Sequence, residues 1–114
     1  MEQITIDNNR LIAEFISIEN PYHKGHYTCP NGIATKLEDM RYNSNWGWIM
    51  EVVQAIERKG FVVAIKGISC AIYPLLQDKP EYYIANFVCG DLSKKIDIVY
   101  TACIEFIKFY NTQK

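Results

Sequence analysis

Two histidines and one cysteine follow each other at intervals of three residues, at His23, His26 and Cys29. Neutral imidazole and thiolate groups are zinc ligands, and a structural zinc site needs four ligands arranged as a tetrahedron. This segment would supply three of them, and Cys70 or Cys89 would supply the fourth. Because the usual zinc motifs pair like ligands across a longer gap, the alternative is a solvated loop that carries two unrelated histidines.

Nothing in the sequence marks a catalytic cysteine or another catalytic group. A cysteine nucleophile needs a base and an orienting group, and Cys103, Cys70 and Cys89 fall in apolar segments, where a thiol is interpreted as a small inert hydrophobe. Glu38 and Asp39 are adjacent and are interpreted as a solvated charge pair, and the six glycines form no phosphate-binding loop. The sequence therefore favours a protein without catalytic residues.

Aromatic side chains gather around the start of a predicted helix and are candidate binding residues; they are Tyr22, Tyr27, Tyr42, Trp46 and Trp48. Aromatic residues are enriched in binding hot spots, and exposed aromatic patches mark contact sites. Trp46 and Trp48 are two positions apart, so one helix cannot turn both toward the same core. We expect an exposed patch near Trp48 and Tyr42, and the alternative is packing, with Trp48 shielding the edge of a sheet.

The composition is that of one folded globular domain, over residues 1–114: hydrophobic residues make up 49% and charged residues 22%. A formal net charge of -1 argues against nucleic acid as a partner and favours self-association. No apolar run approaches the roughly 20 residues that a membrane helix needs. The polar first residues do not resemble a signal peptide, so we expect a cytoplasmic protein with reduced thiols.

Apolar periodicity predicts three helices, over residues 9–16, 46–59 and 94–110. Asp7 or Asn8 can cap the first helix, and Asn45 is the last of three consecutive candidate caps before the second. Gly60 ends the second helix in the left-handed conformation. The expected apolar stripe of the second helix consists of Trp46, Ile49, Met50, Val53 and Ile56.

Residues 61–65, 68–73 and 81–88 are rich in β-branched and aromatic residues and are predicted strands. Their short connections favour an antiparallel meander. Residues 22–34 are expected to form a loop, and residues 35–42 fit either an edge strand or a helical turn. The predicted fold is α+β: a three- or four-stranded antiparallel sheet with helices packed on one face, in the order α-(loop)-α-β-β-β-α.

Three segments together resemble a family of small uncharacterised proteins from Bacteroidetes-type gut bacteria, their phages and mobile elements. They read LIAEFI over residues 11–16, YNSNWGWIMEVVQAIE over residues 42–57 and IEFIKFYN over residues 104–111. The chain departs from the family pattern at Gly47, Glu51 and Phe109, where an acidic residue, proline and tryptophan are common. The resemblance covers about a third of the chain on a segment count. It implies a bacterial or phage origin and supplies no activity and no catalytic residues.

These observations favour a small cytoplasmic binding module that acts through contacts with a protein partner or through self-association, with no cofactor and no nucleic-acid or membrane partner. The alternative is a metal-dependent or small-molecule-dependent protein, enzymes included, that uses His23, His26 and Cys29 with zinc.

Elemental analysis of protein purified without a tag separates the two hypotheses. The zinc hypothesis predicts bound metal, and it predicts that His26→Ala removes the metal and lowers folding stability. The binding-module hypothesis predicts no bound zinc and an unchanged unfolding midpoint in His26→Ala.

Overall fold

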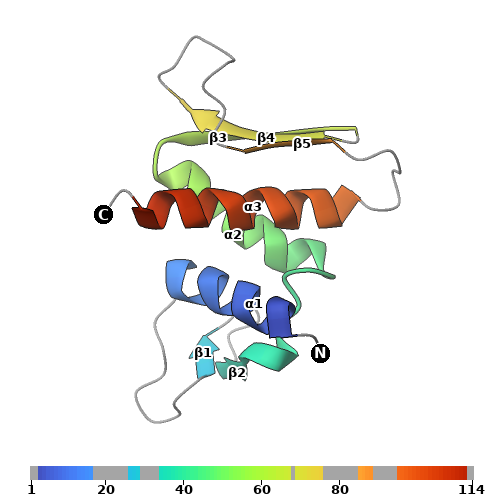
Figure 1. Cartoon of the computed structure of the whole chain (residues 1–114), viewed down its shortest axis with the longest axis vertical. Coiled ribbons are helices and arrows are strands. Elements are labelled where there is room, and N and C mark those ends of the chain that lie inside the picture. The colour runs from blue at the N-terminus through green and yellow to red at the C-terminus, as the bar shows by residue number, and fades with distance from the viewer. Residues whose placement is uncertain are drawn as a thin grey trace.

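A computed structural model describes residues 3–16, 26–28, 34–67, 69–75, 85–88 and 95–112. These residues form three layers, shown from the side in Figure 1. A three-stranded sheet is the first layer, helices α2 and α3 form the second, and helix α1 with a two-stranded ribbon forms the third. Within the described ranges, no helix has the length and apolar character needed to cross a membrane.

The sheet consists of β3 (Phe61–Lys66), β4 (Ser69–Pro74) and β5 (Ala85–Val88), in that order and antiparallel throughout. Gly67 has a φ of 53°, the left-handed value that a tight hairpin turn between two strands requires. Pro74 lies opposite Phe61 at the end of the register. The side chains of Cys70 and Ile72 are fully buried and face the helices.

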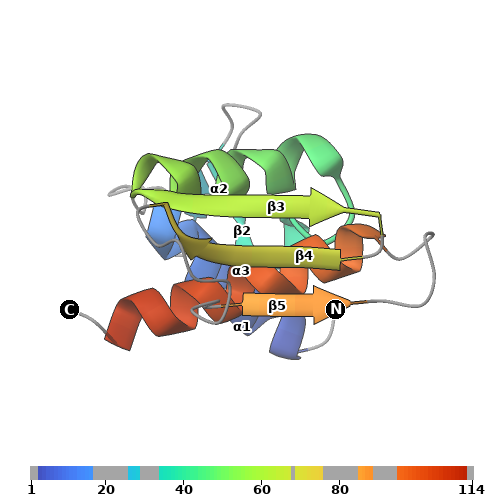
Figure 2. The same cartoon turned by 90° about the horizontal axis from the view of Figure 1, so that it is seen from above.

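Helix α2 (Trp46–Arg58) begins where the Asn45 side chain accepts a hydrogen bond from the Trp48 N–H at 3.2 Å. This N-cap satisfies a donor that would otherwise have no partner in the first turn. The helix ends at Gly60, whose φ of 94° is readily accessible only to glycine. Helix α3 (Lys95–Thr112) crosses under β4 and β5, while α2 packs under β3 (Figures 1 and 2).

The third layer contains α1 (Gln3–Ile16), β1 (His26–Thr28), β2 (Ala34–Lys36) and the short 3-10 helix η1 (Leu37–Asp39). Helix α1 packs against α3 on the side away from the sheet (Figure 1). Its buried Asn9 ties the layer together: Nδ2 donates to the Leu37 carbonyl at 2.9 Å, and Oδ1 accepts from the Tyr100 hydroxyl at 3.5 Å. One side chain thus joins α1 to η1 and to α3.

The structure confirms the α+β class and the packing of helices against antiparallel strands. It also corrects two assignments. The first helix begins at Gln3, not at residue 9, because the side chains of its first turn are linked: Gln3 donates to Asp7 at 2.9 Å, and Asp7 pairs with Arg10. Residues 26–28 and 34–36, placed in or beside the expected loop, pair as β1 and β2. Residues 35–42 contain both of the expected alternatives, a strand end and a helical turn.

Candidate functional site

The expected exposed patch at Tyr42 and Trp48 is wrong. Tyr42 is fully buried, and Trp48 is 8% exposed with its ring 5.1 Å from that of Tyr42 in an edge-to-face contact. Tyr27 is buried as well. Among the five candidate aromatic residues, Trp46 is 42% exposed, and Tyr22 lies outside the described residues.

The buried face of α2 differs from the predicted stripe because the helix is covered by two layers. The sheet lies above it, and the segment around Tyr42 lies below it. Its buried residues are Trp48, Ile49, Val52, Val53 and Ile56. Trp46 and Met50 were assigned to the core and are exposed, so they become the surface residues of this helix.

Of the three zinc ligands proposed from the sequence, the structure describes His26. His26 begins β1, in the third layer, while His23 and Cys29 lie outside the described residues. Cys70 lies in β4, on the far side of the helical layer from β1 (Figure 1), so it cannot complete a site with His26. No group of three metal-ligand side chains occurs within the described ranges. A site formed by His23, His26 and Cys29 stays a prediction.

The two cysteines that the structure describes, Cys70 and Cys103, are buried between the sheet and α3 as free thiols. Burial raises the pKa of Cys70 to about 11. The pKa of Cys103 is raised further, first by burial and then by the neighbouring charge of an ionised Cys70. Because the thiolate is the reactive and metal-binding form, both side chains are held in the inert state at neutral pH.

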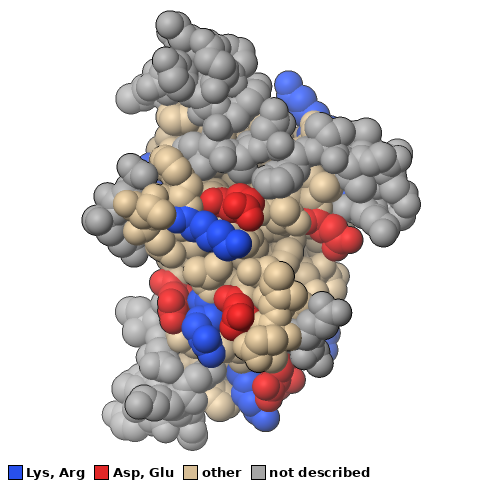
Figure 3. Space-filling model, viewed as in Figure 1, with Lys and Arg blue, Asp and Glu red and all other residues tan. Residues whose placement is uncertain are grey.

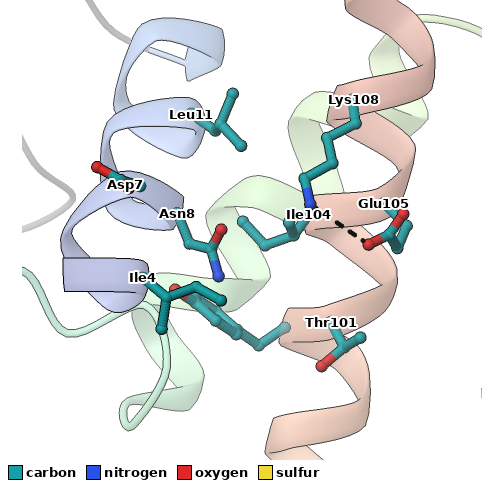
Figure 4. A pocket seen from close by; sticks show the side chains of 9 residues that line it. Ile4, Asp7, Asn8, Leu11, Thr101, Ile104, Glu105 and Lys108 are labelled. Carbon is teal, nitrogen blue, oxygen red and sulfur yellow. Dashed lines mark ion pairs between the residues drawn. The ribbon is translucent and has the colours of Figure 1, made fainter. Parts of the chain in front are cut away.

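A groove between α1 and α3 has a volume of about 470 Å³. It is drawn in Figure 4. Each helix forms one wall of the groove. The lining residues are Ile4, Asp7, Asn8 and Leu11 from α1 and Tyr100, Thr101, Ile104, Glu105 and Lys108 from α3. Asn8 and Ile104 face each other at its middle, while Ile4 lies at one end and Leu11 at the other.

The polar side chains around this groove are already engaged with the protein. Lys108 pairs with Glu105 at 3.6 Å along α3, and Asp7 accepts from Gln3 and pairs with Arg10 at 3.9 Å along α1. Figure 3 shows these two rows of mixed charge with an uncharged strip between them. The rim of the groove therefore carries both signs of charge, and neither sign dominates.

Tyr100 closes the floor of the groove. Burial raises the pKa of Tyr100 to about 12, partly opposed by a hydrogen bond from the Asn8 side chain. A phenol with this pKa stays protonated at neutral pH and acts as a hydrogen-bond donor, not as a base. The lining residues contain no histidine and no cysteine.

Sequence reasoning did not identify the groove, although it contained one usable signal. Ile4, Asn8 and Leu11 recur at spacings of four and three, and these positions share one helical face only when the helix begins at Gln3. The facing residues of α3 are about ninety positions away, as the Asn9–Tyr100 hydrogen bond shows. No match was found among protein-family models, curated proteins or solved structures, so the groove is interpreted from its own geometry.

The burial of the two thiols predicts their reactivity. In a Cys29→Ser/Cys89→Ser variant, a disulfide-exchange reagent at pH 8 should modify neither Cys70 nor Cys103 in the folded protein and both in denaturant. Above the unfolded-state thiol pKa near 9 the unfolded chain loses these protons first, so stability should fall as pH rises toward 11. Rapid modification of either thiol in the folded protein would contradict the burial.

Proposed function

We propose that this protein is a non-enzymatic binding module whose α1–α3 groove receives apolar side chains from a helix of a partner protein. The observation that carries the proposal is the combination of an apolar groove with an exposed apolar rim. Ile4 is 64% exposed at one end of the groove, the buried Ile104 lies at its middle, and the half-buried Leu11 lies at the other end.

The size of the groove supports this partner class. A volume of about 470 Å³ accommodates one or two large side chains, and it lies within the roughly 300–1,000 Å³ of typical binding pockets. Two helices that lie side by side with a groove between them present the surface into which a third, amphipathic helix packs. The exposed apolar surface of Ile4 would leave water on binding, at about 25 cal/mol for each Å² buried.

The rim supports selection of one partner orientation. Asp7 and Asn8 lie on the α1 side, and Thr101, Glu105 and Lys108 lie on the α3 side. A partner helix that places a basic residue near Asp7 would add to the exposed Asp7–Arg10 pair, and a polar residue near Thr101 could hydrogen-bond its hydroxyl. Exposed charge pairs contribute about 0–1 kcal/mol each, so the rim governs specificity and the apolar floor governs affinity.

The proposal predicts that a charge at Ile4 abolishes binding without unfolding the protein. Helical peptides would be selected from a display library against the wild-type chain, and the best would be titrated by calorimetry. Ile4→Arg should weaken their binding at least about tenfold, because arginine puts a charge on the apolar rim. Thr28→Arg adds the same charge at an exposed position of β1, outside the lining, and should change affinity less than about twofold.

Amide chemical shifts place the bound peptide. The proposal requires that the largest changes fall on α1 and α3. Peptides that shift another surface, or that bind Ile4→Arg and wild type equally, would contradict it, as would a library that yields no binder.

A further inference from the structure

We propose that the open edge of β3 and the flank of α2 beneath it bind one extended segment of a partner protein as an added strand. This surface is separate from the α1–α3 groove. Figure 2 shows β3 and α2 on one side of the molecule and β5 with α3 on the other. The inference therefore stands independently of the function proposed for the groove.

The hydrogen-bond register shows which groups of β3 are available. The Leu75 N–H donates to the Gly60 carbonyl at 3.0 Å, which makes these two residues a hydrogen-bonded pair of the antiparallel ladder. Bonded and non-bonded pairs alternate along such a ladder. The N–H and C=O groups of Val62, Ala64 and Lys66 therefore point toward β4, and those of Phe61, Val63 and Ile65 point away from the sheet.

The outward edge has no strand partner in the part of the chain that the structure describes, where β3 pairs with β4 alone. Natural edge strands are usually protected by proline, by charged side chains or by bulges. Residues 61–65 contain neither proline nor charge, and their pairing with β4 runs without a bulge. The edge thus presents three N–H and three C=O groups in strand geometry.

Helix α2 supplies a floor below this edge. Trp48 points down toward Tyr42, and at about 100° per residue Met50 lies nearly opposite Trp48 around the helix. The direction of the buried Val53 lies between these two. Trp46 lies about 40° from Met50, so the two side chains share one flank of the helix. Trp46 is 42% and Met50 37% exposed there.

The position of α2 selects the occupant. In Figure 2 this helix extends past β3 on the outer side of the sheet. Two copies of the chain that approached edge to edge would bring α2 against α2 before their β3 strands could pair. A single extended segment has no helix below it and fits between the edge and the helix. The surface therefore suits a partner strand and not a second copy of this sheet.

The outer edge of β3 and the flank of α2 beneath it, together called the slot, also determine the chemistry of the segment that would bind. Residues opposite Phe61, Val63 and Ile65 would point toward α2, whose first turns, with Trp46 and Met50, lie near the end of β3. Every second residue of the segment should therefore be apolar. Glu57 lies just before the start of β3, and Lys66 lies at its end; neither forms an ion pair with another described residue. A basic residue at one end of the segment and an acidic residue at the other would complement them.

Hydrogen exchange of the free protein tests the slot before any ligand is added. The amides of Val62, Ala64 and Lys66 should exchange slowly, and those of Phe61, Val63 and Ile65 should exchange faster, because only the first set is bonded to β4. Equal protection of the two sets would show that the edge is already occupied and would overturn the proposal. Protection of the second set that rises with protein concentration would identify a second copy as the occupant and would overturn it too.

The binding probe is the blocked peptide Lys-Val-Thr-Val-Thr-Val-Glu, tested with its reverse sequence because either strand direction satisfies the edge. One of the two should bind, slow the exchange of the Phe61, Val63 and Ile65 amides, and leave the α1–α3 groove unshifted. A control peptide with serine in place of each valine should not bind. Absence of binding by both peptides, or shifts confined to another surface, would sink the idea.

Two variants check the assignment of the slot. Val63→Pro removes one outward N–H that the fold does not use and should weaken the peptide at least about tenfold, equivalent to 1.4 kcal/mol. Met50→Lys puts a charge on the floor and should do the same, while Glu51→Lys, about 100° around α2 from Met50 and exposed, should not. If Val63→Pro fails to fold, the Met50→Lys and Glu51→Lys pair still decides; equal binding by that pair contradicts the assignment.

Discussion

The burial of α3 between the sheet and α1 is the constraint on which the rest of this structure depends. A helix covered on two sides needs apolar residues over most of its circumference, and the buried residues of α3 are Val99, Ala102, Cys103, Ile104, Phe106 and Ile107. Phe106 is at the crossing point. Its ring meets Phe61 of β3 at 4.7 Å and Phe15 of α1 at 6.1 Å, both edge to face. One side chain therefore contacts both outer layers.

This arrangement also determines which surfaces are left for binding. Helix α3 can bury only part of its outward face against α1, and the remainder forms one wall of the groove. Helix α2 is turned by its contacts with β3 above and Tyr42 below, and this orientation exposes Trp46 and Met50 at the rim of the sheet. Both proposed binding surfaces thus follow from how the helices are shared between layers.

The sequence predicted the elements that have local signals. Asn45 caps α2 and Gly60 ends it, and each of these acts within a few residues. The sequence-based predictions were wrong or missing where a structural feature depends on a contact between residues that lie far apart in the sequence. The direction of Trp48 depends on Tyr42 and on the layer below, and the pairing of β1 with β2 rests on only three residue pairs. The groove needs α1 beside α3, a contact between the two ends of the chain.

The most direct measurement of this account is a comparison of Phe106→Ala with Phe109→Ala by urea unfolding, followed by far-ultraviolet circular dichroism and tryptophan fluorescence. Both remove the same atoms from α3, but Phe106 is fully buried and Phe109 is exposed. Phe106→Ala should lower the free energy of unfolding by about 3–5 kcal/mol and Phe109→Ala by less than about 0.5 kcal/mol, with both probes reporting one transition. Similar losses in the two variants, or different urea midpoints for the two probes, would contradict a shared core built on α3.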